Sequence, residues 1–175
     1  PDGRRAQIFE SDTAVSSYIK RRVTELAVAA IAEKGAFSMS IGSGTTVDPL
    51  PQLAELVDFS KVHVFFGNER TEGEAAGKCF SGAATFLEAC SVPSENVHRV
   101  PCAPADEAAA SYDTALREMD ETVVGTSERT GLPVLDLVLL GSGADGHCAS
   151  LYPDSAQVTC SPGSERVCLP SFAKG

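Results

Sequence analysis

The sequence predicts an α/β protein with an open, doubly wound and mostly parallel sheet that carries helices on both faces. Short apolar segments alternate along the chain with longer segments whose apolar residues recur every three or four positions. Three of the short segments run directly into polar loops that contain glycine. Strands that alternate with helices are joined by right-handed crossovers, so we expect all three loops at the carboxyl edge of one sheet, where such folds bind ligands.

The first two predicted elements are a long helix and a buried strand. Apolar residues recur at helical spacing over residues 15–31, after the cap candidates Ser11 and Asp12 and before Gly35. Residues 37–41 then predict a short buried strand. The next predicted elements are a helix capped by Asp48 and begun by Pro49, a strand at residues 62–66, a helical segment at residues 80–89, and a strand at residues 96–100.

The second half of the chain continues this alternation. Residues 105–124 follow Pro104 and carry one apolar helical stripe, which consists of Tyr112, Leu116, Met119 and Val123. Residues 134–140 are nearly continuous in Val and Leu, which predicts a central parallel strand covered on both faces. The segment beyond Pro153 is rich in Ser, Pro and Gly, with one further strand predicted at residues 166–169. The 175 residues are expected to form a single domain, 1–175.

Composition excludes several classes of partner. The chain carries 24 acidic and 14 basic side chains, a net charge of -10, without any Lys/Arg block, so neither nucleic acid nor an anionic membrane is an expected partner. No apolar run reaches the roughly 20 residues that a membrane-spanning helix needs. The 6 cysteines form no C-x-x-C pair, which favours free thiols over a zinc site. We expect a cytoplasmic protein with a small-molecule ligand; an organelle such as a plastid is the alternative location.

The first loop, residues 42–46, reads Gly42, Ser43, Gly44, Thr45 and Thr46. Its backbone N–H groups, its three hydroxyls and the dipole of the helix expected to follow it suit a phosphate group. The loop lacks the Gly-Lys-Ser/Thr ending of a nucleoside triphosphate site. A tight strand-to-helix turn without a ligand is the structural alternative.

The second loop places Asn68, Glu69 and Arg70 directly after the strand at residues 62–66. The guanidinium of Arg70 can form a bidentate contact to a phosphate or a carboxylate. The alternative is a salt link between Arg70 and Glu69 that closes the loop.

The third loop contains Gly141, Gly143 and Gly146, which match the G-x-G-x-x-G pattern of dinucleotide-binding proteins. We discount that match because the loop lies late in the chain and no second strand ending in an acidic residue follows it. The glycines instead allow a sharp turn and a close approach of a ligand. We expect His147 at the entrance to a short helix, with Asp145 two residues before it.

A His beside a carboxylate is suited to general-base chemistry. Imidazole has an unperturbed pKa of about 6.5, so His147 can accept a proton from water at neutral pH. The other two histidines, His63 and His98, are interpreted as structural.

These loops resemble three blocks of the 6-phosphogluconolactonases, which belong to the glucosamine-6-phosphate isomerase/6-phosphogluconolactonase superfamily. Residues 65–70 resemble the block FFGDER, residues 139–153 resemble LLGxGxDGHTASLFP, and residues 42–46 occupy the place of an SGGST loop. Asn68 stands where the FFGDER block has an Asp. The related glucosamine-6-phosphate deaminases share the Gly-x-Gly-x-Asp-Gly-His core but continue into Ile-Ala-Phe-Asn-Glu-Pro, whereas this chain continues Cys-Ala-Ser-Leu-Tyr-Pro.

The resemblance implies hydrolysis of 6-phospho-D-glucono-1,5-lactone to 6-phosphogluconate, in the oxidative pentose phosphate pathway, without metal or organic cofactor. In our hypothesis His147 takes a proton from water, Asp145 orients His147, and Arg70 with residues 42–46 holds the phosphate or the developing negative charge. The loop N–H groups near Gly143 to Gly146 are candidate oxyanion donors. Asn68 and Glu69 complete the expected substrate-binding set.

Two alternatives stay open at this point. One is a glucosamine-6-phosphate deaminase-like isomerase, and the other is a catalytically weak, lactonase-like subunit of a larger assembly. Members of the family continue through further strands and helices, including a basic segment that helps to hold the phosphate. We therefore expect that this chain lacks a C-terminal portion of the family's domain.

Overall fold

The computed structural model describes residues 6–153, 155, 157–158 and 167–171 of the chain. Its main sheet has the strand order β3-β2-β1-β6, and every neighbouring pair is parallel. These strands are β1 (Phe37–Ile41), β2 (Val62–Phe66), β3 (Val97–His98) and β6 (Leu137–Val138). A separate antiparallel pair joins β4 (Gly125–Thr126) to β5 (Pro133–Val134).

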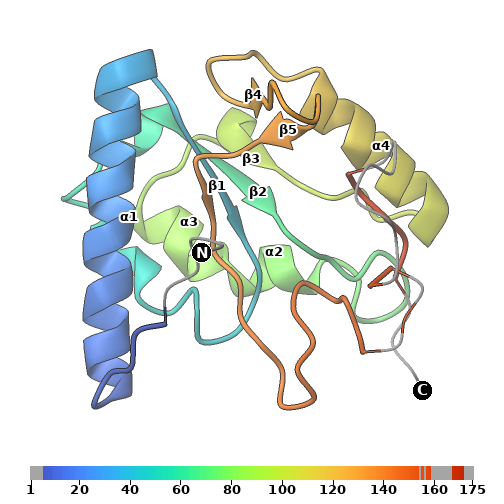
Figure 1. The fold of residues 1–175 in the computed structure, drawn as a ribbon, viewed down its shortest axis with the longest axis horizontal. Helices are drawn as coiled ribbons and strands as arrows, with labels where there is room; N and C mark the ends of the chain where they lie inside the picture. The colour runs from blue at the N-terminus through green and yellow to red at the C-terminus, as the bar shows by residue number, and fades with distance from the viewer. Residues whose placement is uncertain (1–5, 154, 156, 159–166, 172–175) are drawn as a thin grey trace.

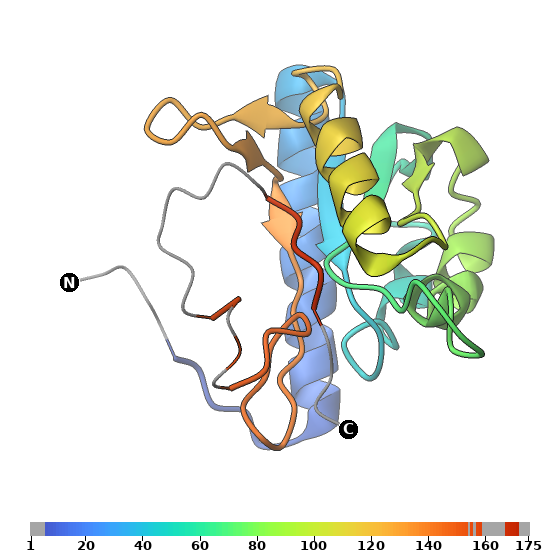
Figure 2. The ribbon, with the colours of Figure 1, turned by 90° about the vertical axis from the view of Figure 1, so that its right-hand side faces the viewer.

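Helices cover both faces of the main sheet, as predicted. The α-helices are α1 (Asp12–Lys34), α2 (Lys78–Gly82), α3 (Ala84–Ala89) and α4 (Ala105–Arg117), and the 3-10 helices are η1 (Leu50–Leu53), η2 (Phe59–Lys61) and η3 (Ser94–Asn96). Figure 1 shows α1 on one side of the sheet and α4 on the other, and Figure 2 shows the same layers after a quarter turn.

The core follows from the alternation of side chains along β1 and β2. One set of alternate residues packs against α1, η1, α2 and α3, and Val23 and Ala27 of α1 are buried there. The opposite face carries Phe65, which packs against Tyr112 and Leu116 of α4. The Tyr112 hydroxyl accepts a hydrogen bond from the Phe66 N–H at 2.9 Å. That hydroxyl therefore ties α4 to the sheet.

The predictions for α1, β1 and β2 are confirmed. The hydroxyl of Ser11 accepts from the Ala14 N–H at 3.2 Å and caps α1. Gly35 ends the helix with φ 85°, a left-handed conformation that glycine adopts without strain.

The predicted helix at residues 105–124 is too long, because α4 ends at Arg117. The Asp120 carboxylate accepts from the backbone N–H of Thr122 at 2.8 Å, and this local bond replaces the helical one. Val123 and Val124 still reach the core below α4. The helix predicted at residues 80–89 is likewise interrupted beside Gly82, a weak helix former, and becomes α2 and α3.

The helix predicted to begin at Asp48 is wrong in type and start. Its place is taken by η1, four residues long with Pro49 as its cap, because Pro49 and Pro51 supply no N–H for helical hydrogen bonds. The strand predicted at residues 96–100 is reduced to β3. The His98 carbonyl accepts from the Tyr112 hydroxyl at 3.1 Å, which takes this acceptor away from the sheet.

The prediction of a central strand at residues 134–140 is also wrong. This apolar run divides into β5 and β6, and β6 pairs with β1 alone at the edge of the described sheet. Val134 and Val138 are 47% and 52% exposed. The expected strand at residues 166–169 is absent from its described part, residues 167–169, and Arg166 lies outside the described residues.

Asp136 interrupts the apolar run and fixes β6 to the sheet. Its carboxylate accepts from the Ser38 N–H at 2.8 Å and pairs with the Lys34 ammonium at 3.0 Å. We expect Asp136→Ala to lower the free energy of unfolding by about 2–3 kcal/mol, because the buried Ser38 N–H and a half-buried Lys34 lose their partner. Urea unfolding measures this, with Asp58→Ala as a control that removes an exposed, local cap. Equal losses for the two variants would contradict the assignment.

His63 and His98 form a partly buried pair on the α4 face. Their rings are stacked with centroids 5.3 Å apart, and His63 Nδ1 lies 3.1 Å from His98 Nε2. Burial, together with the neighbouring His63, lowers the pKa of His98 to about 4. Burial also lowers the pKa of His63. Both rings are therefore neutral in the folded protein at neutral pH, which agrees with a structural role.

This pair makes stability depend on pH. The unfolded chain takes up protons near pH 6.5, whereas the folded His98 does so only near its pKa of about 4, so stability is complete above pH 6.5 and is lost as the pH falls toward 4. We expect a free energy of unfolding roughly 1–2 kcal/mol lower at pH 5 than at pH 7.5, allowing for solvent screening. Urea unfolding at both pH values measures the difference, and His98→Phe should reduce it.

The strand order contains a topological switch point. From β1 the chain continues outward to β2 and β3 with α2 and α3 on one face, and then returns past α4 on the other face to place β6 on the opposite side of β1. Doubly wound folds bind ligands beyond the carboxyl ends of the strands at this point. The loops that follow β1, β2 and β6 therefore meet at one end of the sheet.

Candidate active site

A cavity of about 460 Å³ lies at the switch point, a volume typical of small-molecule sites. It is formed by all three loops that the sequence singles out. Its lining consists of Gly42, Ser43, Gly44, Thr45, Thr46, Asn68, Leu140, Gly141, Ser142, Gly143, His147, Ala149 and Ser150. The orange loop that carries the last of these residues hangs below the sheet in Figure 1, at the end opposite β4 and β5.

His147 and Asp145 form a hydrogen-bonded pair beside this cavity. His147 Nδ1 lies 2.6 Å from Asp145 Oδ1, and the His147 backbone N–H donates to the same oxygen at 3.2 Å. The ring hydrogen bond, followed by the backbone one, lowers the pKa of the Asp145 carboxyl. An ionised carboxylate only accepts, so Nδ1 carries the ring proton, and Nε2, which has no partner among the described residues, is left to accept one.

Gly143 makes room for the imidazole. A Cβ atom at this position would lie 2.2 Å from His147 Cε1 and 2.8 Å from Asp145 Oδ1, far inside contact distance. The glycine of the pattern is thus required by the side chains of the same loop and not by a dinucleotide.

The loop has no helix at His147, contrary to expectation. Residues 141–151 turn tightly on themselves, with isolated bridges from Cys148 to Ser142 and Leu151. The Gly143 N–H donates to the His147 carbonyl at 2.8 Å, and the Gly146 N–H donates to the Gly143 carbonyl at 2.9 Å. These two N–H groups are occupied and are not available as oxyanion donors. For the rest of the loop between Gly143 and Gly146 the expectation stays a prediction.

Arg70 lies at the rim and makes no salt link with Glu69. The Glu69 carboxylate instead accepts from the backbone N–H groups of Arg70, Cys79 and Phe80, at 2.8, 2.8 and 2.9 Å, and caps α2. The Arg70 guanidinium donates to the hydroxyls of Ser150 at 3.3 Å and Tyr152 at 3.4 Å. Within the described residues it has no ion pair, so its positive charge is available to an anion.

The first loop provides polar groups without a helix dipole. The helix that follows it is the short η1, which starts at Leu50 beyond a turn, so the expected dipole contribution is missing. Thr46 Oγ1 is buried and has no hydrogen-bond partner among the described residues. Buried hydroxyls are normally paired, and Thr46 lines the cavity, so a ligand group is a suitable partner.

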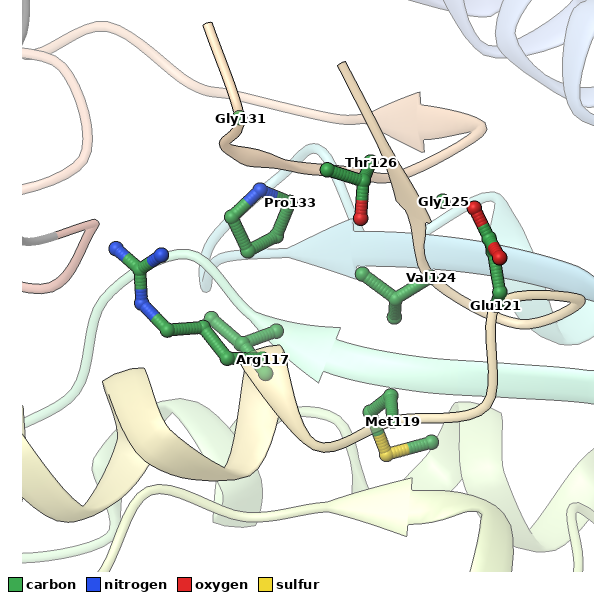
Figure 3. Close-up of a pocket in the computed structure, with 9 residues that line it drawn as sticks. Arg117, Met119, Glu121, Val124, Gly125, Thr126, Gly131 and Pro133 are labelled. Atoms are coloured by element: carbon green, nitrogen blue, oxygen red, sulfur yellow. The ribbon is translucent and has the colours of Figure 1, made fainter. Parts of the chain in front are cut away.

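A second cavity, of about 340 Å³, lies at the opposite end of the strands between α4 and the β4–β5 pair (Figure 3). Of its charged lining residues, Arg117 is paired with Asp113 at 2.7 Å. Its described lining contains neither His nor Cys. The first cavity, which His147 lines, is therefore the candidate active site.

Eight of the twelve site residues expected from the sequence line the cavity, and two of their partners were not expected. Four expected residues do not line it: Arg70, Glu69, Asp145 and Gly146. Of these, Arg70 bonds to Ser150 and Asp145 bonds to His147, and both partners line the cavity. The missed residues are Ser150, which bonds to Asn68 and Arg70, and Tyr152, whose ring lies 4.8 Å from that of His147. The third loop's Ser-Leu-Tyr-Pro segment was the available signal.

Fold and site together define an α/β protein with a His–carboxylate pair at a topological switch point. The chain belongs to the family described as glucosamine-6-phosphate isomerases/6-phosphogluconolactonase, whose sequence profile matches residues 10–173. It is 33% identical over 155 residues to a protein named probable 6-phosphogluconolactonase 3, chloroplastic, from Oryza sativa subsp. indica, covering 83% of this chain and 47% of that protein. It is 31% identical over 159 residues to 6-phosphogluconolactonase 3, chloroplastic, from Arabidopsis thaliana, covering 86% and 49%.

Solved structures confirm the fold. A 6-phosphogluconolactonase from Shewanella baltica superimposes with a TM-score of 0.67 at 19% identity, covering 86% of this chain and 62% of that one. The 6-phosphogluconolactonase from Trypanosoma brucei gives a TM-score of 0.66 at 20% identity, covering 86% and 64%. The chain spans about half the length of the curated relatives it matches. Within the described residues, none of the helices has the length and apolar content to cross a bilayer.

Proposed function

We propose that the protein hydrolyses 6-phospho-D-glucono-1,5-lactone to 6-phosphogluconate in the oxidative pentose phosphate pathway. The observation that carries this proposal is the 2.6 Å bond between His147 Nδ1 and Asp145, which leaves Nε2 without a partner among the described residues, beside a cavity built by three loops. Membership of the family and relatives named 6-phosphogluconolactonase support the choice of substrate.

The proposed reaction begins with a water molecule held by His147. Nε2 takes a proton from this water, and the resulting hydroxide attacks the lactone carbonyl carbon to give a tetrahedral intermediate. When the intermediate collapses, the bond from that carbon to the ring oxygen breaks, and His147 returns the proton to the ring oxygen. Asp145 stays ionised and stabilises the protonated imidazole. These steps use only protein groups and water.

Arg70 and the first loop would hold the anionic parts of the substrate. The guanidinium of Arg70 lacks an ion pair among the described residues, and the Thr46 hydroxyl lacks a partner there. Residues 44–47 of this loop form a tight turn, closed by the bond from the Val47 N–H to the Gly44 carbonyl at 3.1 Å. Asn68 belongs to the same wall. Glu69 contributes by fixing the backbone of Arg70.

An aminosugar-phosphate isomerase is the competing reaction within the family. The chain's Ser150 and Tyr152, which hold Arg70, lie in the segment where the deaminase pattern differs. Parallel assays on the full-length protein separate the two reactions. We expect lactone hydrolysis well above the spontaneous rate and no ammonia release from glucosamine 6-phosphate, and the reverse pattern would reject the lactonase proposal.

We also propose a location in the cytoplasm or in a plastid. Both plant relatives named above carry the word chloroplastic in their names. A fluorescent fusion of the full-length protein would locate it, and a membrane-associated signal would contradict this proposal.

A further inference from the structure

Ser150 connects two of the three loops at the cavity wall. Its side-chain oxygen accepts from Asn68 Nδ2 at 2.9 Å and from an Arg70 guanidinium nitrogen at 3.3 Å. Ser150 itself is only 9% exposed and lines the cavity. A single hydroxyl on the loop after β6 thus accepts hydrogen bonds from two polar side chains of the loop after β2, those of Asn68 and Arg70.

The backbone at Ser150 is held in an unusual conformation. Ala149 and Ser150 have φ of 51° and 62°, in the left-handed region that non-glycine residues seldom adopt. The Ser150 carbonyl accepts from the Ser171 hydroxyl at 2.6 Å. Such backbone strain persists where surrounding contacts hold it, and it is enriched at ligand sites.

The hydrogen bond to Ser150 holds the Arg70 guanidinium in place without neutralising its charge. Arg70 is held by two neutral hydroxyls, those of Ser150 and Tyr152, while the nearby Glu69 carboxylate is occupied by backbone N–H groups. A carboxylate in place of Ser150 would orient the guanidinium but would also cancel its charge. A hydroxyl orients the guanidinium and leaves its full positive charge to attract an anionic ligand.

Asn68 completes the arrangement. A serine oxygen has two lone pairs, and here Asn68 and Arg70 donate to both, so the single Ser150 proton remains to be donated. Among the described residues no group accepts that proton. An ionised Asp at position 68 could not donate to Ser150 and would itself accept the Ser150 proton, which would then not be available to a ligand.

We propose that Ser150 is a positioning residue that holds Arg70 in the orientation that binds the anionic group of a ligand in the cavity. The identity of that ligand as a phosphorylated lactone rests on the proposed function, whereas the positioning of Arg70 does not. Because the effect is on binding, it should appear in KM and in the dissociation constant and not in the chemical step.

The test uses two substitutions that separate the hydroxyl from the backbone. Ser150→Ala and Ser150→Gly both remove the hydroxyl, and the glycine also relieves the left-handed strain. The matched controls are Ser91→Ala and Ser91→Gly, because Ser91 is also left-handed, with φ 50°, but is exposed and follows α3. For each full-length variant we would measure kcat and KM for the lactone and the dissociation constant of 6-phosphogluconate by calorimetry.

We expect both Ser150 variants to raise KM and the dissociation constant about 10-fold, the effect of losing a hydrogen bond to a charged group, with kcat within about 2-fold of wild type. Both Ser91 variants should match wild type. A Ser150→Gly protein with wild-type binding would overturn the proposal, since the backbone alone would then suffice. A fall in kcat with KM unchanged would also overturn it.

These outcomes keep the two proposals apart. If the wild-type protein binds 6-phosphogluconate but hydrolyses no lactone, the proposed function fails, and the dissociation constants alone decide the role of Ser150. If it binds no 6-phosphogluconate, no anion is positioned there and the inference about Ser150 fails as well.

Discussion

Replacement of His147 by Asn is expected to lower kcat/KM for 6-phosphogluconolactone by roughly 10³-fold, within the range of 10² to 10⁴ that a general base contributes. Asn keeps a polar side chain of similar reach but cannot take a proton from water. The Asp145 side chain is 56% exposed, so its carboxylate stays solvated when it loses the imidazole as a partner. The loss of activity should therefore not come from unfolding. Initial rates, corrected for spontaneous hydrolysis, measure the effect.

A matched histidine substitution controls for nonspecific effects. His63→Gln changes a histidine of the structural pair on the α4 face of the sheet, remote from the cavity wall, and should leave kcat/KM within about 2-fold of wild type. If His147→Asn retained wild-type activity above the spontaneous rate, His147 would not be the base and the mechanism proposed above would be wrong.

Substitution of Gly143 by Ala is expected to have the second-largest effect. The new methyl carbon would lie 2.2 Å from His147 Cε1 and 2.3 Å from Nδ1, so the imidazole or the loop must shift by more than an ångström. A displacement of that size in a reacting group costs on the order of 10²-fold in rate. We therefore expect kcat to fall about 10²-fold, as measured by steady-state kinetics.

Two other glycines distinguish displacement from strain. Gly146 has φ 85° and nothing within 4 Å of an added Cβ, so Gly146→Ala should cost about 1 kcal/mol of stability and have a smaller effect on kcat. Gly125→Ala, remote from the site, should change neither. Equal losses of kcat for Gly143→Ala and Gly146→Ala would show that loop strain, and not collision with His147, limits catalysis.

Local signals predicted the parts of the fold that local interactions determine. The cap at Ser11, the left-handed Gly35 and the apolar segments at residues 37–41 and 62–66 are confirmed as the limits of α1, β1 and β2. The meeting of three loops also followed from the alternation of strands and helices, because parallel strands place their carboxyl ends together.

The errors arose where tertiary contacts override the local pattern. The run at residues 134–140 looks like a buried strand, but the bonds of Asp136 to Ser38 and Lys34 divide it, and an apolar run does not show which strands flank it. The Asp120 side chain ends α4 early through a bond that spacing does not reveal.

Within the site, the sequence predicted the residue types better than their partners. The assignment of His147 and Asp145 as neighbours is confirmed by their hydrogen bond, because both lie in one glycine-rich loop. The role of Glu69 depends on the position of α2, to which its carboxylate bonds. The contact of Arg70 with Ser150 joins residues 80 positions apart, and no local pattern indicates it.

The most direct measurement is the rate at which the full-length protein hydrolyses 6-phospho-D-glucono-1,5-lactone, compared with the unphosphorylated glucono-1,5-lactone and with the spontaneous rate of each. The site described here predicts acceleration of the phosphorylated lactone and a kcat/KM at least 10²-fold lower for the unphosphorylated one, since Arg70 and residues 42–46 would then bind no anion. Hydrolysis of the phosphorylated lactone at its spontaneous rate, or equal kcat/KM for the two lactones, would contradict the account.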